Sequence, residues 1–181
     1  VMPIEAVAYA GKGAVELTGS LGDVMKESAR LARSIVRARL KDYGVEYRQV
    51  DLVNDAPDLE GMEQAVKDPR VKAVLIQRSR GYATRASLSV AQIGEMCRRI
   101  KQANPNVSVL VDNCYGEFVE ELEPTQVGAD LIVGSLIKNP GGGLAPTGGY
   151  IAGRRDLVEG AAMRLTAPGI GGECGCTLGQ N

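Results

Sequence analysis

Lys138 stands in a setting that a purely solvent-facing lysine does not need. It ends the apolar run "ADLIVGSLIK" and is followed by Asn139, a proline and, from Gly141 on, three glycines. A lysine in an apolar pocket loses solvation of its ammonium form, so its pKa falls and the neutral amine becomes a nucleophile toward an aldehyde. The segment therefore indicates Schiff-base chemistry.

Other groups suited to the same chemistry lie nearby in the sequence. Asp112 ends the apolar run "VSVLVD", and Ser135 comes three positions before Lys138. A carboxylate against a pyridine nitrogen keeps that nitrogen protonated, a serine hydroxyl donates to a phosphate, and glycines such as Gly141 and Gly142 admit close backbone approach. Together these residues predict a pocket for pyridoxal 5′-phosphate. On spacing alone, the alternative is that Asp112 begins a turn and Lys138 flanks one.

Composition narrows the chemistry further. The 181 residues contain no histidine, which excludes catalytic triads, cysteine–histidine pairs and histidine metal sites. The four cysteines include a single C-x-C pair, and we interpret them as small buried apolar residues rather than metal ligands.

Charge and hydropathy exclude several kinds of partner. The net charge is −1, and no basic stripe suggests nucleic acid or an anionic membrane surface. The apolar runs have the length of strands, and no leader opens the chain, so we expect no membrane partner and a cytoplasmic location.

The elements that must position these residues alternate along the chain. Strands are expected at 4–10, 14–19, 46–52, 71–77, 107–113, 129–135 and 148–153, and helices at 21–41, 58–66, 90–103 and 154–165. Strands separated by helices predict an α/β fold, an αβα layered and mostly parallel sheet. Ligands of such sheets bind at the carboxyl ends of the strands, so Asp112 and Lys138 are expected at one edge.

From about residue 41 onward the chain resembles a known family. The segments "VLIQRSRGYATR", "VDNCYGEFVEELEPTQVGADLIVGSLIKNPGGGLAPTGGYIAGRRDLVE" and "RLTAPGIGGECGCTLGQ" closely resemble the methionine gamma-lyase-like family, also called aluminium resistance proteins, among the fold type I pyridoxal phosphate enzymes. The resemblance implies that Lys138 forms the Schiff base, that Asp112 pairs with the pyridine nitrogen and that Ser135 contacts the phosphate. It also implies carbon-sulfur lyase activity on a methionine- or cysteine-like amino acid, and a homo-oligomer in the parent family.

Residues 1–40 resemble something else, a segment of the proteolytic domain of Lon-type proteases. The serine and lysine dyad of that family lies downstream of this segment and is absent, and Lys12 and Lys26 have no nucleophile motif near them. We therefore expect a composite chain, with a Lon-like segment over 1–44 and a partial pyridoxal phosphate large domain over 45–181, incomplete at both ends. The alternatives are a catalytically inert scaffold or interaction domain, and a fragment of a Lon-type protease.

Further pocket candidates follow the expected strands. Arg78 and Ser79 come directly after "AVLIQ", and Tyr115 and Glu117 come after Asp112. Arg78, Ser79 and Tyr115 are candidates for contacts to the substrate, and Glu117 for lining the pocket. The alternatives are an ordinary polar strand exit and the cap of a short helix.

Overall fold

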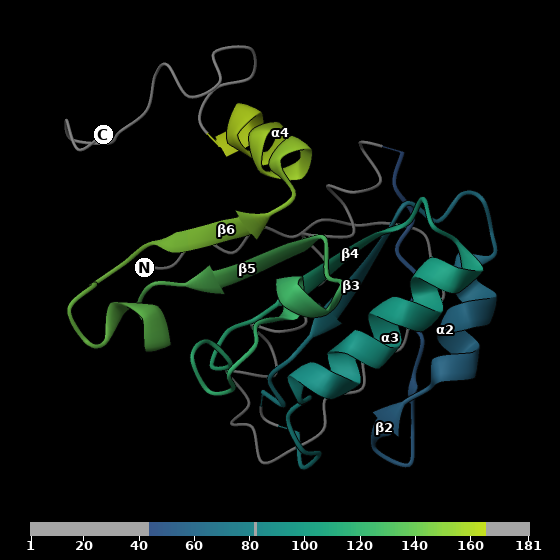
Figure 1. Ribbon diagram of the computed structural model, residues 1–181, viewed down its shortest axis with the longest axis horizontal. Coiled ribbons are helices and arrows are strands. Elements are labelled where there is room, and N and C mark those ends of the chain that lie inside the picture. The colour runs from purple at the N-terminus through teal and green to yellow at the C-terminus, as the bar shows by residue number, and fades with distance from the viewer. Residues whose placement is uncertain (1–43, 82, 166–181) are drawn as a thin grey trace, which may run out of the picture.

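The computed structural model describes residues 44–81 and 83–165, drawn as the coloured ribbon in Figure 1. The strands expected at 4–10 and 14–19 and the helix expected at 21–41 lie outside the described residues, as does most of the Lon-like segment.

A sheet of four strands forms the centre of the described part, in the order β3-β4-β5-β6. Its strands are β3 (Ala73–Gln77), β4 (Ser108–Asp112), β5 (Leu131–Ser135) and β6 (Gly149–Gly153). β3, β4 and β5 are parallel, and β6 is antiparallel to β5. The predicted α/β fold with a mostly parallel sheet is therefore confirmed.

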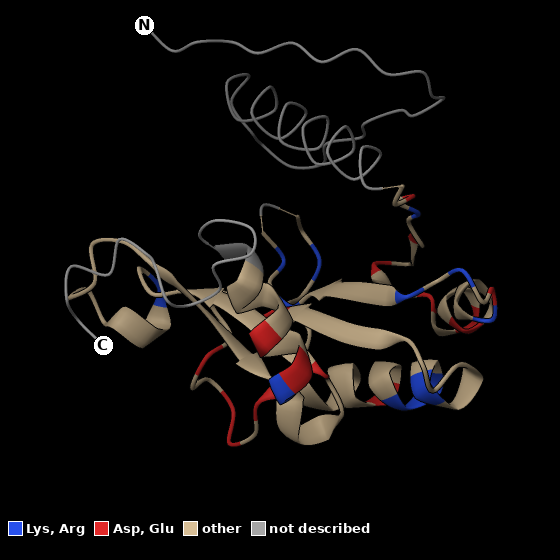
Figure 2. Cartoon of the chain, turned by 90° about the horizontal axis from the view of Figure 1, so that it is seen from above, with Lys and Arg blue, Asp and Glu red and all other residues tan. Residues whose placement is uncertain are grey.

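Two helices pack on one face of this sheet, α2 (Leu59–Val66) and α3 (Val90–Ala103), as Figures 1 and 2 show. α3 begins where the sequence places it because Ser89 and Gln92 form a capping box. Ile93 and Ile100 of α3 and Val109 and Val111 of β4 are fully buried in the shared core. The charged residues lie mainly on helices and loops in Figure 2, while the strands are almost free of them.

The remaining elements follow the sheet edges. They are the 3₁₀ helices η1 (Pro124–Val127) and η2 (Asn139–Gly141) and the helix α4 (Arg155–Leu165), which contacts β6. No helix of the described residues is both long and apolar enough to cross a membrane.

The alternation of side chains along β4 decides which face of the sheet Asp112 lies on. Val109 and Val111 point toward α3, so Asp112 points to the opposite face of the sheet. On that opposite face Leu75 of β3 is 68% exposed and Ile151 of β6 is 43% exposed.

The expected strand at 46–52 is wrong. Only β1 (Leu52–Val53) forms there, and it pairs with β2 (Ala56–Pro57) in a small hairpin separate from the main sheet. Asn54 and Asp55 both have positive φ, of 51° and 60°, which is the geometry of a tight hairpin turn. The run before β1 alternates polar and apolar residues, but all of it is exposed, since no neighbouring strand pairs with it in the described part.

Candidate functional site

The carboxyl ends of the three parallel strands meet at one edge of the sheet. Gln77 lies opposite Asp112, and Asp112 lies opposite Val133, two residues before the end of β5. Ser135 ends β5, and its carbonyl oxygen accepts a hydrogen bond of 3.2 Å from the backbone N–H of Lys138. The structure thus brings Asp112, Ser135 and Lys138 to the same edge.

Lys138 is half-buried and turns toward the loop that follows Asp112. Its Nζ lies 4.6 Å from the centre of the Tyr115 ring, which is the geometry of a cation–π contact. Tyr115 has φ of 67°, a left-handed conformation that is uncommon for a residue with a large side chain. The loop backbone therefore directs an aromatic ring to the lysine.

Asp112 is also half-buried, and its Oδ1 accepts a hydrogen bond of 3.1 Å from the backbone N–H of Cys114. Burial raises the pKa of the Cys114 thiol, and its hydrogen bond to Asp112 raises it further. Cys114 therefore stays a neutral thiol beside the carboxylate at neutral pH. The described residues hold no cluster of histidine, cysteine or carboxylate side chains that could bind a metal ion.

The glycines after Lys138 shape the turn that carries it. A Cβ atom at Gly141 would lie 1.8 Å from the carbonyl oxygen of Leu136, so the turn closes only with glycine. Gly142 has φ of 54° and open space around it, so its requirement is the left-handed backbone. Contacts of Gly141 and Gly142 to a cofactor stay a prediction.

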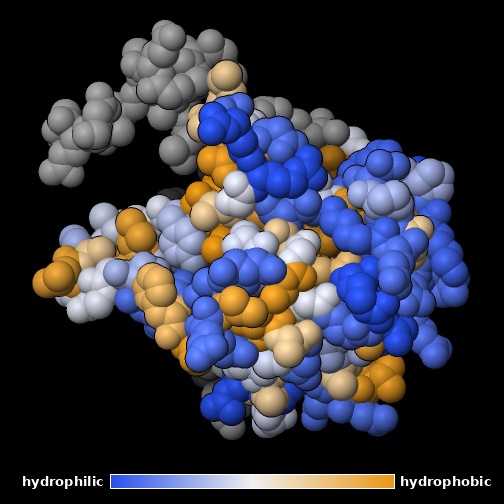
Figure 3. All heavy atoms as spheres, in the orientation of Figure 1, coloured by the Kyte–Doolittle hydropathy of each residue, from blue (hydrophilic) through white to orange (hydrophobic). Residues whose placement is uncertain are grey.

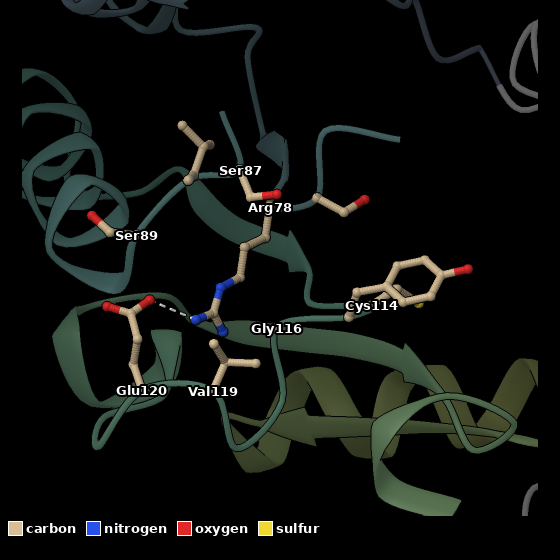
Figure 4. A pocket seen from close by; sticks show the side chains of 10 residues that line it. Arg78, Ser87, Ser89, Cys114, Gly116, Val119 and Glu120 are labelled. Atoms are coloured by element: carbon tan, nitrogen blue, oxygen red, sulfur yellow. Dashed lines mark hydrogen bonds and ion pairs between the residues drawn. The ribbon is translucent and has the colours of Figure 1, made fainter. Parts of the chain in front are cut away.

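A cavity of about 340 Å³ lies between the ends of β3 and β4 and the start of α3 (Figure 4). Its lining includes the three residues expected from the sequence to contact substrate, Arg78, Ser79 and Tyr115. Asp112 and Lys138 are not among the lining residues. Tyr115 therefore belongs to both places, because it lines the cavity and also contacts Lys138.

The terminal nitrogens of Arg78 already have partners within the protein. It is only 3% exposed; its Nη1 donates to Asn113 Oδ1 at 2.8 Å, and its Nη2 pairs with Glu120 Oε1 at 2.7 Å, as the dashed line in Figure 4 marks. Glu123 Oε2 lies 3.6 Å from Nη1. Both terminal nitrogens of Arg78 thus contact protein groups, which favours a structural role over substrate binding.

Glu120 links this ion pair to α3. The same Oε1 that pairs with Arg78 accepts a hydrogen bond of 2.9 Å from the N–H of Val90, at the first turn of α3. A carboxylate is favourable there because the free N–H groups of a helix start attract negative charge. The side chain of Arg78 also explains Gly116, where a Cβ atom would lie 2.4 Å from Arg78 Cδ and 2.5 Å from its Nε.

The sequence did not indicate a second set of hydrogen bonds, which lies next to Lys138. Tyr150 donates its hydroxyl hydrogen to Glu117 Oε1 at 2.9 Å, and Asn139 Nδ2 donates to the carbonyl oxygen of Glu117 at 3.0 Å. Glu117 is a candidate from the sequence, but Tyr150 in "GGYIAG" has the local pattern of any edge-strand aromatic residue. Nothing in that pattern indicates its partner.

Three large apolar side chains on the loops that follow β4 and η2 are exposed. Phe118 and Val119, on the loop after β4, are 78% and 66% exposed, and Leu144, after η2, is 91% exposed. Figure 3 shows apolar atoms at the surface of the end of the molecule that carries η2. Exposed apolar groups gathered in this way are typical of interaction surfaces or ligand grooves.

Comparison with known proteins identifies the family. The sequence profile of the methionine gamma-lyase family matches residues 5–181. The chain belongs to this family. The resemblance recognised from the segments around Asp112 and Lys138 is therefore confirmed, and the match also includes most of the residues that resemble Lon.

The chain spans less than half the length of the curated relative described next. YnbB of Bacillus subtilis, an uncharacterized protein, is 48% identical over 163 residues, which cover 90% of this chain and 38% of YnbB. A short likeness to Lon is found as well, with 48% identity to the Lon protease of Aquifex aeolicus over 61 residues, or 32% of this chain and 8% of that protease.

Solved structures agree with the family assignment. A Clostridium acetobutylicum protein, provisionally named a cystathionine beta-lyase involved in aluminium resistance, is 56% identical with a TM-score of 0.72 and matches 75% of this chain and 33% of its own. The carbon-sulfur lyase involved in aluminium resistance from Clostridium novyi is 51% identical with a TM-score of 0.70, over 75% of this chain and 32% of its own. This chain therefore spans about a third of the length of these two proteins.

Proposed function

We propose that the chain is part of a carbon-sulfur lyase that uses pyridoxal 5′-phosphate and acts on a methionine- or cysteine-like amino acid. The observation that carries this proposal is the arrangement at the sheet edge, where Asp112 ends β4 and Lys138 lies over Tyr115 just beyond β5. The family and the name of the Clostridium novyi relative support the reaction class.

The residues at this edge fit the cofactor by their chemistry. The amine of Lys138 suits the cofactor aldehyde, the carboxylate of Asp112 suits the pyridine nitrogen, and the hydroxyl of Ser135 suits the phosphate. When bound, pyridoxal 5′-phosphate supplies an electron sink for the negative charge left when a substrate loses its α proton.

The side chains of the chain itself have separate tasks in this proposal. The Lys138 amine accepts the α proton of the substrate, and the resulting ammonium group is stabilised by the face of the Tyr115 ring. Asp112 holds a proton on the pyridine nitrogen as its ion-pair partner. Cys114, as a neutral thiol, adds no second negative charge beside Asp112.

The test is covalent capture of the cofactor by Lys138. The chain is mixed with pyridoxal 5′-phosphate, reduced with borohydride, digested and analysed by mass spectrometry. We expect a visible absorption band before reduction and a cofactor label on Lys138 afterwards, both lost in Lys138→Ala. Lys72→Ala is the matched control. Lys72 is exposed, and its amine donates to the carbonyl oxygen of Pro69 at 2.8 Å.

Two outcomes would count against the proposal. The first is folded protein with no label at Lys138 at any cofactor concentration, and the second is a label spread equally over Lys138 and Lys72. An assay for sulfur-containing products then separates the lyase from the inert scaffold. Turnover that is lost in Lys138→Ala supports the lyase, whereas a labelled Lys138 without turnover supports the scaffold.

A further inference from the structure

Glu117 is a buried acid with an incomplete set of partners. It is 3% exposed, and its Oε2 has no hydrogen-bond partner among the described residues. Burying a carboxyl group is unfavourable unless its oxygens are satisfied, and an apolar side chain of similar size would pack there at lower cost. The residue therefore serves something other than core packing.

The contacts of Glu117 join three separate segments around the lysine. Its carbonyl oxygen accepts from Asn139, the residue directly after Lys138, and its Oε1 accepts from Tyr150 of β6. Glu117 itself lies on the loop after β4. The segment that carries Lys138 is thus tied through one residue to two neighbouring parts of the fold.

β5 leaves room for the contact between Glu117 and Tyr150. A Cβ atom at Gly134 would lie 2.4 Å from Tyr150 Cε1 and 2.5 Å from Glu117 Oε1, so no side chain fits there. Gly134 immediately precedes Ser135, the last residue of β5. The missing side chain makes room for the tyrosine–glutamate hydrogen bond next to the start of the lysine turn.

Tyr115, the aromatic partner of Lys138, lies on the same loop as Glu117. Tyr115 is two positions before Glu117 and has φ of 67°, and Phe118 directly after Glu117 has φ of 61°. Non-glycine residues keep such conformations only where the surrounding structure imposes them. Glu117, anchored at both its carbonyl and its carboxylate, lies between the two strained residues and holds the loop in this shape.

Tyr150 is a permanent donor in this arrangement. Burial raises the pKa of its phenol, the Glu117 carboxylate raises it further, and the contact with Asn113 acts in the opposite direction. The hydroxyl therefore keeps its proton across the pH range in which enzymes are usually assayed.

We propose that Glu117, Tyr150 and Asn139 form a positioning network that sets the Lys138 amine against the Tyr115 ring. This inference rests on the proposed function, since Lys138 is the cofactor-binding lysine in that proposal. None of the three residues of the network is itself catalytic. They act by holding the loop after β4 in place, since Asn139 ties it to the turn after β5 and Tyr150 ties it to β6.

The first experiment measures how fast Lys138 is labelled in the protein with bound cofactor. Tyr150→Phe and Asn139→Ala each remove one hydrogen bond of the network. We expect the rate of reductive labelling at Lys138 to fall about tenfold to a hundredfold, as for a misplaced reactive group. The pH midpoint of the visible band should also fall by about half a unit, because the protonated, positively charged form of the cofactor-bound lysine nitrogen loses its aromatic partner.

Matched controls separate positioning from general damage. Tyr47→Phe removes a hydroxyl on the exposed segment before β1, and Asn106→Ala removes an amide on the exposed turn between α3 and β4. Both should leave the labelling rate and the pH midpoint at wild-type values. Glu117→Gln keeps an acceptor for Tyr150 and should behave like wild type, whereas Glu117→Ala should behave like Tyr150→Phe.

The second experiment needs no cofactor and keeps the inference testable if the proposed function fails. Hydrogen exchange of the peptide spanning 136–144 should be faster in Asn139→Ala and Tyr150→Phe than in the two controls. If wild type gives no label at Lys138, the proposed function fails while this exchange result still decides the network. Exchange, labelling rates and pH midpoints equal to the controls would overturn the network.

Discussion

The sequence makes Arg78 a candidate for substrate binding, whereas its contacts in the structure favour a structural role. The substitution Arg78→Met tests which of the two roles it has. The substitution keeps an unbranched apolar stem of similar length but removes both donors to Asn113 and Glu120. Asn113 Oδ1 would then lack its donor in a site where the residue is 0% exposed. Glu120, with 38% of its side chain exposed, can regain water.

The expected loss of unfolding free energy follows from these exposed fractions. Breaking a fully buried pair costs about 3–5 kcal/mol, and a buried acceptor left without a donor costs about 1–3 kcal/mol. Because Glu120 rehydrates, we expect Arg78→Met to lower the free energy of unfolding by about 2–4 kcal/mol. For a domain of this size that corresponds to a Tm lower by roughly 6–12 °C.

The assay is urea and thermal unfolding followed by far-ultraviolet circular dichroism at neutral pH. Arg98→Met is the control, because Arg98 also pairs with a glutamate but has 52% of its side chain exposed. It should change the unfolding midpoint far less. An unchanged midpoint in Arg78→Met, together with weaker substrate binding, would refute the structural interpretation and restore Arg78 as a substrate ligand.

Three further predictions concern the stability of the fold. Asp130→Asn should destabilise the chain at neutral pH, because burial raises the pKa of Asp130 but hydrogen bonds from Lys101, the Val109 N–H and Arg154 outweigh it and lower the pKa. A lowered pKa adds stability above the usual carboxyl range and loses it as pH falls, so the difference from wild type in urea unfolding should shrink below about pH 4. Gly141→Ala should lower stability by about 1–3 kcal/mol through its clash, whereas Gly160→Ala, in open space on α4, should be neutral or stabilising in the same thermal melts. Ser89→Ala should cost about 1 kcal/mol in urea unfolding, because the first turn of α3 loses its cap; no loss would show that the cap is dispensable.

Local signals predict much of the fold. α3 appears at 90–103 as expected, because its apolar period and its capping residues lie within a few positions of each other. β4 and β5 are short apolar runs, and the rule that ligands gather at the carboxyl edge of parallel strands places Asp112, Ser135 and Lys138 together. The run 46–52 has an equally good local pattern and forms no strand in the main sheet, because a strand also needs a neighbour.

The sequence by itself determined the helices α2, α3 and α4, a mostly parallel sheet and the edge at which Asp112 and Lys138 lie, since these depend on periodicity, caps and chain direction. Only the tertiary structure decided which side chains meet there. Asn139 and Tyr150 lie 22 and 33 positions from Glu117, and Arg78 lies 42 positions from Glu120. No period or motif links residues so far apart, because their distance in space depends on how the strands pair and how the loops between them close.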